Sequence, residues 1–149
     1  TKKIINAMCE DPRIGSFYNN PSFGYGGHCF PKDTKQLSSS LENSVLVNAI
    51  VESNKEREMI VANEIIKHTK DKESIIGFYN YANKNSSAYE VANIIKNNGY
   101  NVIFFDWSIN SKLEFENFIK KSDLIVANRL DEEIYVYKEK VFSRDLFRY

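Results

Sequence analysis

Short apolar segments alternate with amphipathic ones throughout the second half of the chain, and this alternation restricts the fold more than any other feature. Three segments are short and apolar, as β-strands are: SIIGFY (74–79), NVIFFD (101–106) and DLIVAN (123–128). Two segments with helical spacing lie between them: 86–98 and 111–121. Strands that alternate with helices form right-handed β-α-β units and a parallel sheet. We therefore predict a parallel sheet here, with strand centres at Ile76, Ile103 and Ile125.

Other residues in this half fit the same organisation. Gly99 follows the first helical segment, where a residue with positive φ commonly ends a helix. A short helix is predicted to begin within DEEIYVYK (131–138), after the third strand. The predicted fold class is α/β, with a long central helix followed by a small Rossmann-like domain at residues 71–149.

Residues 1–70 are predicted to form a separate unit built around that long helix. From about residue 43 to 68, apolar residues recur at helical spacing, and neither glycine nor proline interrupts them. A helix of ~25 residues spans roughly 37 Å, which is longer than a small domain needs. We therefore predict that it bridges two domains or two subunits. Residues 1–9 indicate the end of an earlier helix, with a buried face of four side chains: Ile4, Ile5, Met8 and Cys9.

Composition excludes several classes of function. Twenty basic and twenty acidic side chains cancel, so no overall field attracts nucleic acid or an acidic membrane. The longest apolar runs fall far short of the ~20 residues that a membrane span needs, and we identify no cluster of metal ligands. The two cysteines, Cys9 and Cys29, form no disulfide framework, which fits a reducing cytoplasm. The chain begins with Thr1 rather than Met, which suggests a piece of a longer protein.

A long loop at residues 10–36 carries the most chemistry. It holds all three prolines and four of the six glycines, together with several aromatic residues that give it material to pack. Long loops inside compact proteins are usually functional. The glycines let backbone N–H groups approach an anion closely, as a diphosphate requires.

Cys29 lies within this loop, in the segment GGHCFPKD. Pro31 suits the first turn of a helix, so Cys29 is predicted at or just before a helix N-terminus, with Lys32 nearby. Both features favour the thiolate over the thiol. Asp33 could orient water or a hydroxyl near the sulfur. The residues alone also allow Cys29 to be a small buried hydrophobic side chain, with glycines that only form turns.

Four segments closely resemble the UDP-glucose/GDP-mannose dehydrogenase family. The longest is DPRIGSFYNNPSFGYGGHCFPKDTKQL (11–37), which corresponds to the active-site segment of these nucleotide-sugar dehydrogenases. The others are AIVESNKER (49–57), IVANR (125–129) and VFSRDLF (141–147). The resemblance covers nearly the whole chain and is weakest between residues 80 and 120.

The resemblance implies an NAD-dependent oxidation. Members of this family oxidise the C6 alcohol of a sugar to a carboxylate in two hydride transfers, which for UDP-glucose gives UDP-glucuronate. By its match to the motif, Cys29 would be the nucleophile that attacks the intermediate aldehyde and forms a thiohemiacetal and then a thioester. Asp33 would help to activate or position the water that hydrolyses the thioester. Lys32 would lie on the cofactor side of the site.

The resemblance also implies substrate and subunit contacts. The loop residues that would wrap the nucleotide sugar are Tyr18, Asn19, Asn20, Pro21, Ser22 and Gly26. Arg13 would reach a substrate that is bound mainly by the neighbouring subunit. Helix 43–68 would form a homodimer with its twin. Residues 1–70 would then be the end of the central dimerisation domain, and residues 71–149 the C-terminal domain that binds the UDP-sugar.

Two features depart from the family pattern. The chain has no GxGxxG segment, so NAD would be bound mainly by an N-terminal domain outside this chain, and the chain alone is expected to be inactive. The segment NYANKNSSAYEV (80–91) contains no arginine, and Lys84 is its only cation. The choice between UDP and GDP, and among hexoses, therefore stays open.

Two alternative functions stay open as well: a non-catalytic module that binds nucleotide sugars and dimerises, and an independent thiol enzyme that uses Cys29. His28 as the base of such an enzyme is disfavoured, because adjacent side chains usually point apart. For Trp107, packing is favoured over stacking on a base. For Arg129, which follows the third strand, contact with a phosphate and a structural ion pair both stay open.

Overall fold

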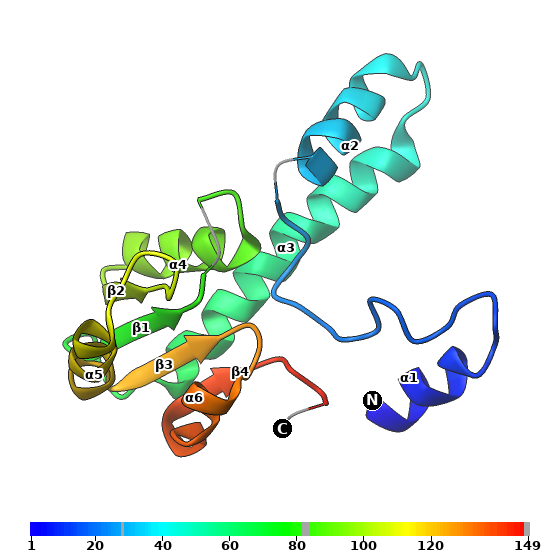
Figure 1. Ribbon diagram of the computed structural model, residues 1–149. Helices are drawn as coiled ribbons and strands as arrows, with labels where there is room; N and C mark the ends of the chain where they lie inside the picture. The colour runs from blue at the N-terminus through cyan, green and yellow to red at the C-terminus, as the bar shows by residue number, and fades with distance from the viewer. Residues whose placement is uncertain (28, 82–83, 148–149) are drawn as a thin grey trace.

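The computed structural model describes residues 1–27, 29–81 and 84–147. Its centre is a parallel sheet of four strands in the order β2-β1-β3-β4 (Figure 1). The strands are β1 (Ile75–Tyr79), β2 (Asn101–Phe105), β3 (Leu124–Ala127) and β4 (Val141–Ser143). Every neighbouring pair is parallel, which confirms the predicted sheet and its three strands. The edge strand β4 was not predicted, because three residues are too few to show an alternating pattern.

The helices also fall where the sequence predicts them. They are α1 (Lys2–Cys9), α2 (Cys29–Ser40), α3 (Val45–His68), α4 (Ser87–Asn97), α5 (Lys112–Lys121) and α6 (Glu132–Tyr135), with a 3-10 helix η1 at Lys138–Lys140. Ser111 and Glu114 form a capping box at the start of α5. Gly99 has φ +85° just after α4, as expected for a residue that ends a helix.

Helices cover both faces of the sheet. The C-terminal half of α3 packs with α4 against one face, through a core that includes Ile76, Phe78 and Val126. On the other face, α5 and α6 pack against Tyr79, Ile125 and other buried residues. Successive residues of one strand thus serve opposite cores, as the period of two requires.

Gly77, in the centre of β1, marks a close contact between the sheet and α5. A Cβ atom at this position would lie 2.2 Å from Ser122 Oγ and 2.6 Å from Phe118 Cε2. Glycine is needed here because a larger residue would push α5 away from the sheet.

The α2–α3 hairpin extends away from the sheet (Figure 1) and leaves apolar side chains exposed. Val45 and Leu46, at the start of α3, are 78% and 76% exposed. The predicted buried face of α1 is wrong for this chain: no residue of α1 is buried, and Ile4 is 66% exposed. Cys9 is only partly buried. The α1 prediction failed because helical spacing identifies an apolar face but not whether another element covers it.

None of the helices in the described ranges is long and apolar enough to cross a membrane.

Candidate functional site

The strand order of the sheet creates a crevice between β1 and β3. The chain passes from β1 to β2 on one side and from β2 to β3 on the other, so the order reverses between β1 and β3. Open α/β sheets bind ligands at the carboxyl ends of the strands at such a point. A cavity of about 610 Å³ lies there, and we call it the switch cavity. Asn80 follows β1, Asn128 follows β3, and both line this cavity.

A second cavity, of about 960 Å³, lies beside the first, and we call it the loop cleft. Its lining includes five predicted substrate-binding residues: Tyr18, Asn19, Asn20, Pro21 and Ser22. Asn54 and Arg57 of α3 line the opposite side. Asn20 and Arg129 line both the loop cleft and the switch cavity, so the two cavities adjoin. The structure therefore brings these five residues to one surface, and their role toward a substrate stays a prediction.

Two arginines fix the backbone of the loop. Arg57 donates to the Ser22 carbonyl from Nε at 3.1 Å and from Nη2 at 2.8 Å. Arg129 donates from Nη1 to the Pro21 carbonyl at 2.6 Å and from Nη2 to the Asn20 carbonyl at 2.8 Å. Among the described residues, the hydrogen-bond acceptors of Arg129 are thus backbone carbonyls, which disfavours the ion-pair alternative, while contact with a phosphate stays a prediction.

Side chains also join the loop to the sheet. Asn20 donates from Nδ2 to the buried Asp145 carboxylate at 2.9 Å, and its Oδ1 accepts from the Leu146 amide at 3.0 Å. Ser22 donates to Asn128 Oδ1 at 3.1 Å. These contacts span more than 100 residues of sequence, so the α/β unit fixes residues 20–22 of the loop.

Tyr18, within the loop, has an unusual backbone conformation. Its backbone angle φ is +55°, a value that residues other than glycine rarely adopt, and its side chain is fully exposed. Such residues commonly occur at functional sites, at a cost of order 1–3 kcal/mol. The position of Tyr18 in the loop cleft is consistent with that pattern.

A third cavity, of about 580 Å³, is lined by residues of the loop, α2, α3 and α4, and we call it the lysine cavity. Lys32, Lys35 and Lys55 line it, together with Gly26 and the acidic residues Glu58 and Glu90. It shares Tyr25 and Asn54 with the loop cleft. Lys32 therefore lies apart from the loop cleft, in a cavity that adjoins it.

Cys29 is exposed and is the first residue of α2. This confirms its predicted place at a helix N-terminus and shows that its reading as a buried hydrophobic side chain is wrong. Cys29 and Asp33 stand outside the lining of the three cavities. Asp33 Oδ1 lies 3.4 Å from Lys32 Nζ, with both side chains largely exposed. Their catalytic roles stay predictions.

Gly26 is required by packing between two segments of the chain. A Cβ atom at Gly26 would lie 2.7 Å from the Ser87 amide nitrogen and 3.0 Å from the Asn85 carbonyl oxygen. Glycine at this position lets the loop pack directly against the N-terminus of α4. Gly26 lines the lysine cavity rather than the loop cleft, so the structure separates it from the other predicted substrate-binding residues.

Glu58 is a buried carboxyl group in the wall of the lysine cavity. Burial, and then the negative charge of Glu90, raise its pKa to about 7. A hydrogen bond from Asn54 Nδ2 to Glu58 Oε1, at 3.2 Å, acts in the opposite direction. Glu58 therefore changes charge near neutral pH, within a cavity that also holds three lysines.

Some predicted residues lie elsewhere. The side chain of Arg13 is 88% exposed and pairs with Asp11 at 2.6 Å, and this contact holds the pKa of Asp11 below its usual range. Arg13 lines none of the three cavities. Lys84 is exposed. His28 lies outside the described residues.

Trp107 packs at the carboxyl end of the sheet, as predicted. Its ring lies against Phe105 and Phe115, and its Nε1–H donates to the Tyr79 hydroxyl at 2.7 Å. Tyr79 in turn donates to Asp131 at 2.6 Å. Burial raises the pKa of Tyr79, and the hydrogen bond to Asp131 raises it further, so this hydroxyl stays protonated and serves as a hydrogen-bond donor.

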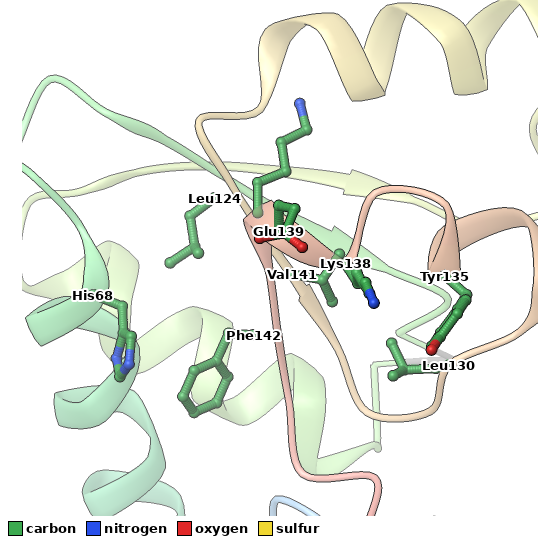
Figure 2. Close-up of a pocket in the computed structure, with 9 residues that line it drawn as sticks. His68, Leu124, Leu130, Tyr135, Lys138, Glu139, Val141 and Phe142 are labelled. Atoms are coloured by element: carbon green, nitrogen blue, oxygen red, sulfur yellow. The ribbon is translucent and has the colours of Figure 1, made fainter. Parts of the chain in front are cut away.

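A fourth cavity, of about 510 Å³, lies along the edge strand β4. His68 and Tyr135 stand at opposite ends of it, with Phe142 and Val141 between them (Figure 2). Tyr135 is 43% exposed. None of the predicted site residues lines this cavity, and we do not assign it to the candidate site.

Sequence reasoning missed the residues that hold the loop, in particular Asn54, Arg57 and Asp145. A signal for the first two was present, because ESNKERE (52–58) is a wholly polar stretch in the middle of an otherwise apolar helix. A polar stretch there can face a polar cleft as well as solvent. Asp145 had no signal beyond its place in a segment of family resemblance.

Comparison with known proteins connects this geometry to a family. Residues 1–57 match the model of the UDP-glucose/GDP-mannose dehydrogenase family, central domain. The chain is 38% identical to a UDP-glucose 6-dehydrogenase of Streptococcus pneumoniae over 98% of its own length. It is 39% identical to a UDP-glucose 6-dehydrogenase of Campylobacter jejuni over 97% of its length. It spans 41% of each of these relatives.

Solved structures share the fold. A UDP-glucose dehydrogenase from Pyrobaculum islandicum superposes with a TM-score of 0.73 at 19% identity, over 96% of this chain and 39% of that one. A GDP-mannose dehydrogenase from Pseudomonas aeruginosa superposes with a TM-score of 0.69 at 18% identity, over 96% of this chain and 42% of that one.

The fold and the cavities define a parallel α/β unit with a cavity at its switch point, joined to a helical arm that carries an exposed cysteine. With the sequence matches, these features identify the family: the chain belongs to the UDP-glucose/GDP-mannose dehydrogenase family.

Proposed function

We propose that the chain is the part of an NAD-dependent nucleotide-sugar dehydrogenase that supplies the thiol nucleophile and much of the substrate site. The observation that carries this proposal is a continuous series of three cavities. Asn20 and Arg129 link the switch cavity to the loop cleft, and Tyr25 and Asn54 link the loop cleft to the lysine cavity. The series begins where α/β folds bind nucleotides and ends beside the first turn of α2, which begins with Cys29.

We favour UDP-glucose as the substrate, because the similar proteins from S. pneumoniae and C. jejuni both have the name UDP-glucose 6-dehydrogenase. We place the nucleotide in the switch cavity and the sugar toward the lysine cavity. Residues 71–149 would then be the domain that binds the nucleotide sugar, and residues 1–70 the end of the central domain. GDP-mannose or another UDP- or GDP-hexose is the alternative substrate.

Cys29 would act in the second oxidation. Its sulfur attacks the C6 aldehyde, and the aldehyde oxygen takes up a proton, which gives a thiohemiacetal. Loss of a hydride from this carbon, with loss of the proton from its hydroxyl group, would leave a thioester, and water activated by Asp33 would then cleave the carbon–sulfur bond. The carboxylate departs and the thiol is restored. NAD⁺ serves only as the hydride acceptor, once in each oxidation.

The residues of this chain do not form a complete binding site for NAD by themselves. The segment that follows β1 in the sequence, NYANKNS (80–86), contains no glycine, whereas a dinucleotide-binding turn needs glycines so that its backbone can approach the pyrophosphate. We therefore propose that NAD is bound mainly outside this chain, with Lys32 on the cofactor side. We expect the protein to act in the cytoplasm.

A homodimer through α3 is part of the proposal. Val45, Leu46 and Ile50 are exposed apolar residues on the first half of this helix, and Leu37 and Leu41 on or just after α2 are exposed beside it. Exposed apolar faces of this kind are typical of protein interfaces. Arg13 would then contact the substrate of the neighbouring subunit.

Calorimetric titration with nucleotide sugars tests the substrate assignment. We expect the chain to bind UDP-glucose more tightly than GDP-mannose, and we expect Arg129→Met to weaken this binding at least tenfold, since it releases the carbonyls of residues 20 and 21. Lys120→Met, an exposed change on α5, is the matched control. Equal binding by both variants, or no binding of either sugar by the wild type, would overturn the assignment.

A further inference from the structure

One asparagine of α3 holds the turn between the substrate loop and the cysteine helix. Asn54 Oδ1 accepts from the Tyr25 amide at 2.8 Å, and Asn54 Nδ2 donates to the Tyr25 carbonyl at 3.0 Å. A single side chain thus satisfies both backbone groups of Tyr25. Gly24 makes room for this contact, because a Cβ atom there would lie 2.8 Å from Asn54 Oδ1.

Tyr25 transmits this constraint to α2. Its ring lies edge-on to the ring of Phe30, with the centroids 4.9 Å apart and an interplanar angle of 76°. Phe30 is the second residue of α2 and follows Cys29 directly. The backbone of Tyr25 is therefore connected to the first turn of α2 by one packed aromatic pair.

The same segment has anchors on α4 and on the loop before it. Ser87 Oγ donates to the Gly24 carbonyl at 3.0 Å, and the Gly27 amide donates to the Asn85 carbonyl at 2.9 Å. Asn54 supplies the anchor on α3, and it lines both the loop cleft and the lysine cavity.

We propose that Asn54 is a positioning residue for Cys29. By fixing Tyr25 it fixes the first turn of α2, and so sets where the sulfur stands relative to a ligand in the loop cleft. The catalytic consequence rests on the proposed dehydrogenase function. The effect on Cys29 itself does not.

The first test uses the complete dehydrogenase that contains this chain. In Asn54→Leu, which has a similar volume but no hydrogen-bonding groups, we expect kcat for UDP-glucuronate formation to fall at least fivefold. The KM for UDP-glucose should change less than threefold, because Asn20, Arg57 and Arg129 still hold the loop. Asn63→Leu, an exposed position on the same helix, should match the wild type. A smaller fall in kcat, or a loss confined to KM, overturns the proposal.

The second test needs no turnover. In the 149-residue chain, iodoacetamide alkylation of each cysteine is followed by mass spectrometry of peptides. We expect Asn54→Leu and Asn54→Ala to change the rate of Cys29 alkylation at least threefold, because a displaced first turn of α2 alters the surroundings of the sulfur. Cys9 should react at the wild-type rate, which would show that the effect is specific to Cys29.

The two tests separate the failures. If the wild-type enzyme makes no UDP-glucuronate, the proposed function is wrong, while alkylation still decides the role of Asn54. Equal Cys29 rates in wild type, Asn54→Leu and Asn54→Ala overturn that role whatever the enzyme does. A change in the Cys9 rate of the same size as that of Cys29 overturns it as well, because the effect is then not specific to the first turn of α2.

Discussion

The α/β unit and the substrate loop are held together by different forces. The unit has two apolar cores, with Phe78, Ile125 and Val126 almost completely inaccessible to solvent. In the loop, Phe23 is the one residue that is fully buried among those described at 10–27, and it belongs to the core shared by α3 and α4. Residues 20–25 of the loop are fixed largely by polar contacts, among them those from Asn54, Arg57 and Arg129.

This difference separates stability from function. Buried apolar area is non-directional, so it stabilises the unit without placing any one group with accuracy. Hydrogen bonds contribute only about 1 kcal/mol each, or about 1.5–3 kcal/mol where the donor is charged as in Arg57 and Arg129, but they fix direction and distance. A loop that must place side chains around a ligand therefore gains more from polar contacts than from a larger core.

The largest effect on stability is expected from the core. Phe78→Ala should lower the free energy of unfolding by about 3–5 kcal/mol, because it removes a fully buried aromatic side chain and leaves a cavity. Leu46→Ala, at a position 76% exposed, should change it by less than about 0.5 kcal/mol. Urea denaturation measures both. Similar losses in the two variants would mean that the α2–α3 arm is as well packed as the sheet.

A smaller effect is expected where the loop joins the sheet. Asp145→Ala should cost about 1–3 kcal/mol, because the Asn20 amide and the Leu130 N–H lose a buried acceptor. The same variant should weaken UDP-glucose binding, since Asn20 lines the loop cleft. Thermal unfolding and calorimetry on one sample check both. Weaker stability with unchanged affinity would show that this contact does not position the loop.

The smallest effect concerns pH. The pKa of Glu58 in the folded protein is raised to about 7 from an ordinary value of 4.5, so the folded state binds more protons than the unfolded state between these values. The contribution of Glu58 to stability therefore falls as pH rises through this window. The other charged side chains that line the same cavity are Glu90, Lys32, Lys35 and Lys55.

Glu58→Gln removes this dependence. Relative to the wild type, the variant should gain on the order of 1 kcal/mol in unfolding free energy between pH 5 and pH 8, after allowance for solvent screening. Glu116→Gln, at an exposed position on α5, should show no such gain. Denaturant unfolding at the two pH values measures the difference. A constant offset between Glu58→Gln and wild type would contradict the raised pKa.

The sequence predicted the α/β unit well because its signals are local. Strands such as LIVA and the glycine after α4 carry their structure in a few adjacent residues. It also predicted five loop residues that the structure brings to one cleft, through family resemblance. It did not predict Asn54 or Asp145 as the residues that hold the loop, because those contacts join segments 29 and 125 residues apart. Pattern reasoning has no access to such pairs.

The prediction for α1 shows the same limit of sequence patterns. Its apolar positions have helical spacing, and the helix formed, but no residue of it is buried. Periodicity reports which face is apolar, while burial depends on what packs against that face. The first half of α3 likewise has an apolar face that is exposed in this chain. Whether a second copy of α3 covers this face in a dimer can be tested by sedimentation, not by the sequence pattern.

The central claim is that Cys29 is the nucleophile of a nucleotide-sugar oxidation, and the most direct measurement is NADH formation from UDP-glucose by the complete enzyme. We expect Cys29→Ala to form no UDP-glucuronate and Cys29→Ser to stall after the aldehyde, because a hydroxyl is a far weaker nucleophile than a thiolate. The isolated 149-residue chain should form no NADH. Unchanged acid production by Cys29→Ala, or NADH formation by the isolated chain, would contradict the account.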